Sequence, residues 1–600
     1  MSIKLKDRFF APRQASNITV TIPSAIKRCE ETGRIEAFKL NWTPGCDKPM
    51  PHIFWDSDVA KVMEGMAYVS NQPGGEKIKE RLDELVRLVV SAQQPDGYLN
   101  THFTVTEQDK RWTNLFNWHE LYCAGHLTEA AVAHYQATGN RLFLDAMCRY
   151  VDYIWSVFGE GGREGYPGHE EIELALCKLY KVTGNPMHLK LAKLFIDRRG
   201  TKPNYYVEKE HMDAGGLPNR QAHIPVREQT EAVGHAVRAV YLYSGMADIA
   251  ALTGDKELLD ACKRLFDSIT QHRMAITGGI GSNPSGEAFC EDDDLPNDRT
   301  YNESCASIGL VLFASRMLAL TNEEKYADVI ERCIFNGALS GISLKGDSYF
   351  YVNRLEYNNN TLQYSHASAT RQPWYNCSCC PTNYCRFLPQ LGNFCYRATK
   401  DMLAIDIPVA ASVDTDDFAV DIASDYPYDG KVAVTIRRGG KFTLAIRIPA
   451  WCEDNPVLPA GGEIVNGYWK SLREWKTGET LNITFPMQVK RIICRAPADI
   501  GKVALTRGPI VYCVEAPENA GYAPIELSVP ANANFELVPV EALLPGTVGI
   551  RFTAQRRIPS SKLYSSEAPA TEPKTVTAIP YALWQNRGNV QMSVYMMDAR

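Results

Sequence analysis

The chain repeats one helical pattern four times between residues 125 and 345. Each copy has an apolar helix, a Thr-Gly or Thr-Asn turn and a second, amphipathic helix, with turns that read ATGNRLFLDAM, VTGNPMHLKLA, LTGDKELLDAC and LTNEEKYADVI. A glycine at such a turn is typical of a left-handed helix C-cap, which we expect at Gly139, Gly184 and Gly254. Each pair of helices exposes an apolar face that it cannot bury alone, so the pairs must pack together.

The spacing of the turns selects among helical architectures. Thr138, Thr183, Thr253 and Thr321 are too unevenly separated for a solenoid of equal repeats. Successive helical hairpins can instead close into a toroid that buries the inner helices on both sides and leaves long loops at one end to form a pocket. We therefore predict a catalytic (α/α)6 barrel over residues 15–395.

From residue 396 the pattern changes to short alternating segments. FAVDIASDY, KVAVTIRRGGKFTLAIRIP, GKVALTRGPIVYCVE and VQMSVYMM carry β-branched residues at period two between Gly, Asp and Pro. Such segments predict strands and hairpins, and we assign residues 396–600 to one or two β-sandwich domains. Residues 1–14 are predicted to pair with this β region, and the Pro- and Ala-rich stretch 555–580 to be an irregular crossing.

Charge and hydropathy argue against several classes of partner. The formal net charge of −6, spread without long runs of one sign, argues against nucleic-acid binding. The N-terminus MSIKLKDRFFAPRQ lacks the apolar stretch of a signal peptide, and no window approaches about 18 consecutive apolar residues, so no membrane span is predicted. We expect a cytoplasmic protein in which most of the 17 cysteines are reduced and buried.

A small set of residues stands out as candidates for chemistry: Glu287 in GEAF, Glu303 and Cys305 in NESC, Cys377, Cys379 and Cys380 in NCSCCP, and His235 in EAVGHAVR. Glu303 and Cys305 can face one point if they precede a helix that begins near Ala306. The adjacent pair Cys379 and Cys380, followed by Pro381, is expected to converge only in irregular backbone. Three thiolates and a carboxylate suit zinc, although the paired CxxC hooks of a zinc ribbon are missing. On the residues alone, a metal site and a set of buried structural or redox-active thiols remain alternatives.

Several motifs together resemble glycoside hydrolase family 127, the β-L-arabinofuranosidases. They are WHELYCAGHLTEAA, GGIGSNPSGEAF, DLPNDRTYNESCASIG and YNCSCCPTN, and the resemblance extends over most of the chain. It implies an (α/α)6 barrel joined to β-sandwiches. It also implies a zinc ion held by Glu303, Cys305, Cys379 and Cys380.

The resemblance implies catalytic and sugar-binding roles as well. Cys379 is the implied nucleophile and Glu287 the implied general acid and base. His235 matches a histidine that contacts the sugar, and His169 with either His126 or His119 are further candidates. Cys377 has no assigned role.

Elementary chemistry is consistent with these roles. A free thiol with a pKa near 8.5 is mostly protonated at neutral pH, and metal coordination removes that proton. Attack by the thiolate, with proton donation by Glu287 and then water activated by the same residue, releases the sugar with retained configuration. Because the acid must start protonated, we expect the pKa of Glu287 to be raised.

The sequence thus predicts a retaining exo-glycosidase that removes terminal β-L-arabinofuranosides from small oligosaccharides or glycosides. One alternative is a hydrolase of a related acidic or branched furanoside from pectin, and another is a different (α/α)6 glycosidase, lyase or epimerase. A third is a carbohydrate-binding protein with a structural zinc, which would release no sugar. The oligomeric state stays open, with a homodimer as one option.

Overall fold

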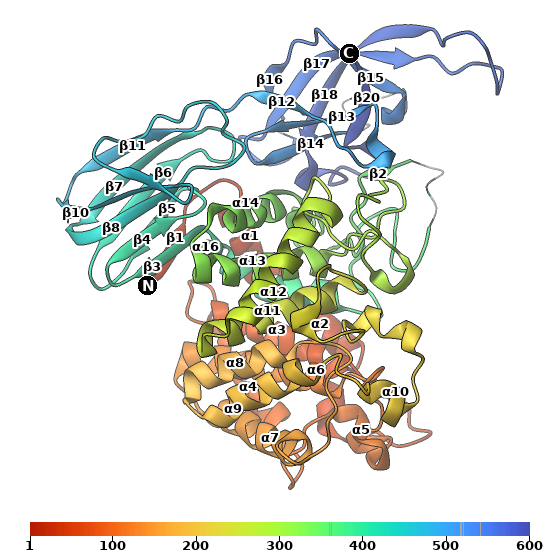
Figure 1. Ribbon diagram of the computed structural model, residues 1–600, viewed down its shortest axis with the longest axis vertical. Helices are drawn as coiled ribbons and strands as arrows, with labels where there is room; N and C mark the ends of the chain where they lie inside the picture. Colours follow the sequence, from red (N-terminus) through yellow and green to blue (C-terminus); the bar gives the residue numbers. More distant parts are fainter. Residues whose placement is uncertain (359–360, 362, 516–518, 520, 541) are drawn as a thin grey trace.

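The computed structural model describes residues 1–358, 361, 363–515, 519, 521–540 and 542–600. Figure 1 shows three parts: a helical body coloured red to green, and two β-rich units, cyan and blue, that lie at one end of it. The N-terminal strand lies in the cyan unit, far along the sequence from its neighbours there.

Six helices form the inner ring of the helical body, and each packs against the next until the last meets the first. They are α3 (Trp55–Val69), α6 (Glu120–Thr138), α8 (Ile172–Thr183), α11 (Ala236–Thr253), α13 (Ser304–Thr321) and α15 (Cys379–Phe387). Most of their residues are buried, because neighbours flank each helix on both sides.

A second layer of helices covers the ring from outside. Its members are α2 (Ile22–Glu31), α4 (Glu76–Ser91), α7 (Leu142–Phe158), α9 (Pro186–Arg198), α12 (Lys256–Ser268) and α14 (Glu324–Arg332). Each turns an apolar face inward, and α2 packs on both α15 and α3, where the ring closes. The predicted (α/α)6 barrel is confirmed.

The predicted C-caps are also confirmed. Helices α6, α8 and α11 end at Gly139, Gly184 and Gly254, with φ of 72°, 69° and 73°. The fourth turn uses Asn322 in the same conformation, with φ of 54°. Glycine adopts this conformation without steric cost, so each turn reverses the chain within a few residues.

Helix α13 is the one helix in the described part of the chain that is long and apolar enough to cross a membrane. Buried residues make up 67% of it, because it belongs to the inner ring. Its apolar sequence is therefore explained by the barrel core.

The first β unit contains two five-stranded sheets, ordered β1-β5-β6-β7-β11 and β3-β4-β8-β10-β9. Their strands are β1 (Ser2–Leu5), β3 (Tyr396–Thr399), β4 (Met402–Ile405), β5 (Ala411–Asp414), β6 (Ala419–Ser424), β7 (Lys431–Arg438), β8 (Gly440–Arg447), β9 (Glu463–Val465), β10 (Tyr468–Trp475) and β11 (Thr480–Thr484). Phe418, beside β6, stacks on Phe442 of β8 at 4.3 Å between ring centroids, so the two sheets share a core. Strand β1 pairs antiparallel with β5, which ties the N-terminus to this unit.

The last β unit is built on one ten-stranded sheet. Its strands are β2 (Glu356–Tyr357), β12 (Val489–Ile492), β13 (Lys502–Arg507), β14 (Ile510–Glu515), β15 (Leu527–Pro530), β16 (Glu536–Pro539), β17 (Val548–Arg557), β18 (Thr571–Pro580), β19 (Met592–Ser593) and β20 (Tyr595–Ala599). Strand β13 pairs with both β20 and β14, which closes part of the sheet on itself.

The irregular crossing predicted for residues 555–580 is confirmed only for residues 558–570 and is wrong for the residues on either side. Residues 555–557 belong to strand β17 and residues 571–580 to strand β18, and the two strands form a long antiparallel pair joined by residues 558–570. Alternating burial along β18 continues through Pro573, which pairs with Gln555. Proline content therefore does not separate the connection from the strand, because Pro559 and Pro569 lie in the connection and Pro573 and Pro580 lie in β18.

The close approach of α3 and α15 yields a stability prediction. A methyl group at Gly65 would lie 2.3 Å from the carbonyl oxygen of Cys385, so Gly65→Ala must push the two helices apart. We expect a loss of about 1–3 kcal/mol in the free energy of unfolding of the barrel. Urea denaturation followed by circular dichroism measures it. Gly215→Ala, where the added methyl meets nothing closer than 3.5 Å, is the control and should change stability by less than about 0.5 kcal/mol. Equal midpoints for the two variants would contradict the argument.

Candidate active site

A cavity of ≈ 350 Å³ opens at the end of the barrel where the inner helices begin. Each of the six helices contributes a lining residue at or just before its first turn: Phe54, His119, His169, His235, Glu303 and Cys379. The positive ends of the helix dipoles therefore point toward one space, which favours negatively charged groups there. The volume lies at the lower end of the ~300–1,000 Å³ common for small-molecule sites.

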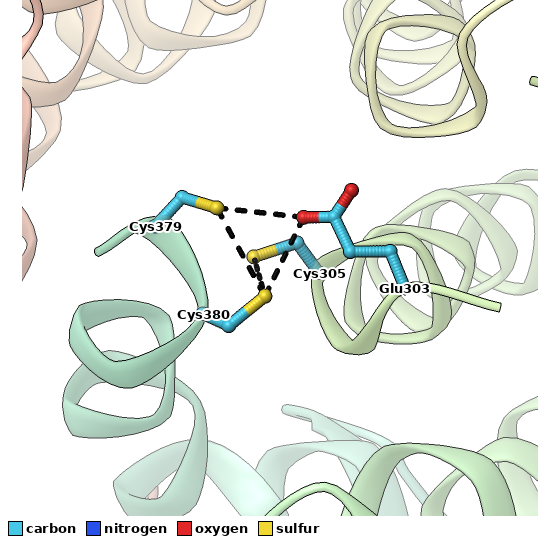
Figure 2. A group of neighbouring side chains, drawn as sticks. All are labelled: Glu303, Cys305, Cys379 and Cys380. Atoms are coloured by element: carbon cyan, nitrogen blue, oxygen red, sulfur yellow. Dashed lines mark hydrogen bonds between the residues drawn. The ribbon is translucent and has the colours of Figure 1, made fainter. Parts of the chain in front are cut away.

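One carboxyl group and three thiols meet at one wall of this cavity, where Glu303, Cys305 and Cys379 line it and Cys380 is buried behind them. Figure 2 shows Glu303 and Cys305 at the start of α13 facing Cys379 and Cys380 at the start of α15. The Sγ atoms of Cys305 and Cys380 are 3.4 Å apart, and those of Cys379 and Cys380 are 3.9 Å apart. Glu303 Oε1 lies 3.4 Å from the sulfurs of both Cys379 and Cys380.

These distances fit a single tetrahedral metal ion. A metal–sulfur bond of about 2.3 Å places the ligand atoms of a tetrahedron about 3.8 Å apart. The four ligand atoms here all lie within 4.8 Å of one another. The second carboxylate oxygen of Glu303 is buried without a hydrogen-bond partner, as expected for a group that lacks its counter-ion.

The electrostatics of the cluster also call for a cation. Burial and the neighbouring thiol of Cys379 raise the pKa of Glu303 well above its ordinary value. Burial and hydrogen bonds to Cys305 and Cys379 do the same to Cys380. Burial acts to raise the pKa of Cys305 as well, but hydrogen bonds from Cys379 and Cys380 lower it to about 6. Four acidic groups this close cannot all ionise without a positive charge among them, so the cluster fits a metal ion.

The backbone that brings the cluster together differs from our expectation. Helix α13 begins at Ser304, so Cys305 lies in its first turn and Glu303 is the N-cap residue. Cys379 and Cys380 are the first residues of α15 and are not in irregular backbone. Pro381 permits this because the first turn of a helix needs no hydrogen bond from its backbone nitrogens.

Cys379 is the most accessible thiol of the cluster. It lines the cavity and is half-buried, whereas Cys305 and Cys380 are buried. The hydroxyl of Tyr351 lies 3.0 Å from Cys379 Sγ and 3.7 Å from Cys377 Sγ. Cys377 also lines the cavity but is not one of the four clustered ligands. Its hydrogen bond with Cys379, together with burial, raises its pKa and keeps it a neutral thiol.

Glu287 lies in the same cavity, on the short turn Ser285–Glu287. Its φ of 54° is unusual for a residue with a side chain, and this conformation directs the carboxylate toward His235. His235 Nε2 lies 3.0 Å from Glu287 Oε2, and His366 Nδ1 lies 3.8 Å from Glu287 Oε1. The ligand atoms of His235, Glu287 and Glu303 lie within 4.8 Å of one another, so Glu287 is close to the metal-binding cluster.

The expectation that the pKa of Glu287 is raised is wrong, because the surrounding protein groups lower it. Burial acts to raise the pKa, but the hydrogen bond and charge of His235, with a smaller contribution from His366, outweigh burial and lower it to about 2. Burial in turn lowers the pKa of His235, although Glu287 opposes that shift. The neighbouring histidines, which could not be assigned to this contact from sequence, are the reason for the difference.

Three of the four predicted histidines line the cavity, namely His119, His169 and His235. Their rings lie in a row, with centroids 5.5 Å apart for His119 and His169 and 5.6 Å apart for His169 and His235. Burial, reinforced by the charge of Arg238, lowers the pKa of His119 to about 3 and that of His169 well below its ordinary value. The imidazoles are therefore neutral, and each can exchange hydrogen bonds with sugar hydroxyls.

The predicted site must be corrected at His126, which was a candidate for sugar binding. It is fully buried in the middle of α6 and does not line the cavity. Its Nδ1 lies 3.1 Å from Glu171 and 3.5 Å from Glu129. His119 and His126 share a helix face, but seven residues move His126 about 10 Å along the helix axis, away from the cavity.

Sequence reasoning missed several residues at the site. Tyr351 contacts two cysteines, Tyr301 lies 2.9 Å from His366, and Tyr122 and Arg238 line the cavity. Tyr301 stands two positions before Glu303 within the DLPNDRTYNESC motif, so proximity to the motif was a usable signal. Tyr122 and Arg238 each follow a predicted histidine by three residues, one helical turn, which was also a usable signal. Tyr351 comes from a separate segment, and no spacing in the sequence connects it to the site.

Comparison with known proteins assigns the whole chain to one kind of enzyme. The family described as "Beta-L-arabinofuranosidase, GH127 catalytic domain" matches residues 2–393, and the GH127 middle and C-terminal domains match residues 403–487 and 491–597. A non-reducing end β-L-arabinofuranosidase of Bifidobacterium longum subsp. longum is 36% identical over 589 residues, covering 90% of this chain and 89% of the relative.

Solved structures agree with these matches. A GH127 β-L-arabinofuranosidase from Geobacillus stearothermophilus T6 superposes with a TM-score of 0.95 at 42% identity and full coverage of both chains. A second GH127 β-arabinofuranosidase gives a TM-score of 0.90 at 35% identity and covers 100% of this chain and 96% of its own.

The cluster geometry predicts which cysteines retain a metal. Cys380→Ser removes a buried ligand, so we expect the bound divalent metal to fall from about one per chain to well below half. Cys377→Ser is the matched control, because Cys377 lies two residues from Cys379 but outside the four ligands. Mass spectrometry of the metal content of the purified variants measures both. Equal metal loss in the two variants would argue against the assignment.

Proposed function

The chain belongs to glycoside hydrolase family 127, and from that membership we propose that it is a retaining exo-β-L-arabinofuranosidase with Cys379 as nucleophile and Glu287 as general acid and base. The observation that supports this most directly is the position of Cys379. It is a cavity-facing thiol within a cluster of four acidic ligands, and Glu287 lines the same cavity. The modest cavity volume suits a terminal sugar rather than a chain that runs through the site.

Zinc is the metal that we propose for the cluster. Glu303, Cys305, Cys379 and Cys380 would hold it, because three thiolates and a carboxylate form the sulfur-rich tetrahedral set that zinc prefers. When bound, zinc would keep the thiols deprotonated at neutral pH. The dipoles of α13 and α15, whose N-termini meet at the cluster, favour the same thiolates.

In the first step, the Cys379 thiolate attacks the anomeric carbon of the bound sugar. A carbon–sulfur bond forms as the bond to the leaving oxygen breaks, and Glu287 gives its proton to that oxygen. Tyr351, 3.0 Å from the attacking sulfur, orients the thiolate toward the cavity. The neutral imidazoles of His119 and His169 are placed to bind hydroxyls of the sugar.

In the second step, water replaces the leaving group. The Glu287 carboxylate takes a proton from water, the oxygen attacks the anomeric carbon, and the carbon–sulfur bond breaks to restore the Cys379 thiolate. Two displacements at one carbon return the original configuration. The product therefore keeps the β configuration of the substrate.

The contact between Glu287 and His235 influences whether Glu287 carries the proton that it donates in the first step. That contact lowers the pKa of the carboxyl group, while burial acts in the opposite direction. A sugar hydroxyl that takes the His235 hydrogen bond for itself leaves burial as the main influence on Glu287. Its pKa then rises, and the carboxyl group holds its proton at the moment of attack.

The nucleophile assignment is tested with p-nitrophenyl β-L-arabinofuranoside. Cys379→Ala should lower kcat by about a thousandfold or more, because the covalent route is lost. Mass spectrometry of the quenched wild-type enzyme should find a pentosyl adduct on Cys379, and NMR should find the β anomer first. Cys148→Ser, on outer helix α7, is the control and should keep the wild-type rate. Turnover close to wild type in Cys379→Ala, or release of the opposite anomer, would overturn the proposal.

The Glu287 contact predicts a change in pH dependence. His235→Phe removes the partner that lowers the pKa of Glu287 and leaves burial, so that pKa rises. Because the protonated form is required, the alkaline limb of kcat/KM should move to higher pH by about one unit or more, even as the maximal rate falls.

His366→Phe is the matched comparison for the pH measurement. Its contact with Glu287 is longer, 3.8 Å against 3.0 Å for His235, so its shift should have the same sign and be smaller. An unchanged alkaline limb in His235→Phe would show that this contact does not control the acid.

A further inference from the structure

Two arginine side chains line the cavity next to Glu287 without a carboxylate partner. Arg220 and Arg238 both belong to the cavity wall. Among the described residues, no carboxylate lies within the 4 Å of an ion pair with either guanidinium, and their hydrogen bonds go to neutral groups. Buried cations are normally paired, so a pair of arginines held only by neutral acceptors needs an explanation.

Arg238 is the more deeply buried of the two, with 9% of its surface exposed. It lies in the first turn of α11, three residues after His235. Its Nη1 donates to the side-chain oxygen of Asn219 at 2.7 Å, while its Nε is buried without a partner. Burial lowers its pKa, against the attraction of Glu170 and Glu287, but the group stays cationic at neutral pH.

Arg220 is held rigidly by neutral groups. Its guanidinium stacks 3.5 Å from the ring centroid of Phe116, and its Nε donates to the Phe116 carbonyl at 2.8 Å. Its Nη2 donates to Asn117 at 3.0 Å. Burial lowers its pKa to about 10, helped by the nearby positive charge of Arg238, so it too is cationic at neutral pH.

The acidic groups near the two arginines are engaged elsewhere. Glu170 lies 2.7 Å from Arg199, and Glu287 lies 3.0 Å from His235. His119 and His169 on the same wall are neutral and add no charge of either sign. The two guanidiniums therefore form a local positive region in the cavity, with donors to spare at Arg238.

Asn219 connects this positive region to the acid. Its side-chain oxygen accepts from Arg238 at 2.7 Å and from Arg220 at 3.4 Å, and its Nδ2 donates to the Gly286 carbonyl at 2.9 Å. Gly286 directly precedes Glu287, so the arginines lie on the side of the cavity where the acid stands. In the proposed mechanism, that is the side on which the leaving group departs.

We propose that Arg220 and Arg238 form a subsite for a carboxylate on the leaving group, so that preferred substrates are β-L-arabinofuranosides of an acidic aglycone. The inference rests on the proposed function, because only the role of Glu287 as acid identifies the leaving-group side. Guanidinium groups bind carboxylates through paired, charge-assisted hydrogen bonds. A hexuronic acid and a hydroxy acid both present this group, and the shape of the rest of the subsite selects between them.

Two synthetic substrates test the subsite with leaving groups of nearly equal reactivity. They are the 4-(carboxymethyl)phenyl β-L-arabinofuranoside and its neutral amide, 4-(carbamoylmethyl)phenyl β-L-arabinofuranoside. The wild-type enzyme should have a kcat/KM about tenfold higher for the carboxylate, in line with a charge-assisted contact. Glycosides of a hexuronic acid and of a hydroxy acid, compared in the same assay, identify the source of the carboxylate.

Variants separate an anion subsite from a structural role. Arg238→Gln and the less buried Arg220→Gln should each bring the carboxylate-to-amide ratio of kcat/KM close to one, while Arg238→Lys should keep part of the preference. Arg87→Gln, an exposed arginine of α4, controls for the loss of one positive charge and should keep the wild-type ratio. Thermal melting confirms that each variant is folded.

Each outcome has a distinct meaning. A wild-type ratio near one, or variants that lower both rates equally, would overturn the subsite and leave the arginines with a structural role. Failure of the wild-type enzyme to hydrolyse either arabinofuranoside would overturn the proposed function itself.

Discussion

The barrel depends on the way α15 closes the ring, and one buried guanidinium makes that closure specific. Arg386 Nη1 donates to Glu64 of α3 at 2.9 Å and to Glu129 of α6 at 2.6 Å, and its Nη2 donates to Tyr241 of α11 at 3.0 Å. One cation thus joins α15 to three other inner helices. A shift of α15 would leave buried charges unpaired, at a cost of about 3–5 kcal/mol. Because α15 begins with Cys379, the same network sets the position of the thiol that we propose as the nucleophile.

The direction of the inner helices explains why acidic groups gather at one end of the barrel. All six helices start at the cavity, so their dipoles and free backbone N–H groups favour thiolates and carboxylates there. That preference does not balance the charge of four acidic groups within 4.8 Å of one another, and their arrangement fits a metal ion. Arg34 supports the segment that leads into the cluster, because its guanidinium is paired with Asp58 at 2.8 Å and donates to the Asn376 carbonyl at 2.7 Å.

The cavity has an acidic wall and a basic wall, and Glu287 lies where they meet. The metal-binding cluster makes one wall negative, and Arg220 and Arg238 make the other positive. Glu287 is therefore influenced by both, which explains why burial alone did not predict its pKa. His235 reverses the effect of burial at a distance of 3.0 Å. The contact with His235 therefore keeps the Glu287 carboxyl group ionised at neutral pH.

The sequence by itself determined the fold class, because helical hairpins with left-handed glycine caps and period-two strands depend on local chemistry. It also placed the four residues of the cluster in two close pairs along the chain, Glu303 with Cys305 and Cys379 with Cys380, but on the residues alone it left a metal site and structural thiols as alternatives. The second pair lies in the first turn of α15 and not in the expected irregular backbone, because a first helical turn accepts Pro381. Tertiary structure alone decided which histidines reach the cavity. His119 stands at the cavity end of α6, and His126 lies further along the same helix in the barrel core. Tertiary structure alone also brought Tyr351 to Cys379, His235 to Glu287 and Arg220 to Arg238. These contacts join separate elements, and packing sets their distances, so no spacing along the chain could predict them.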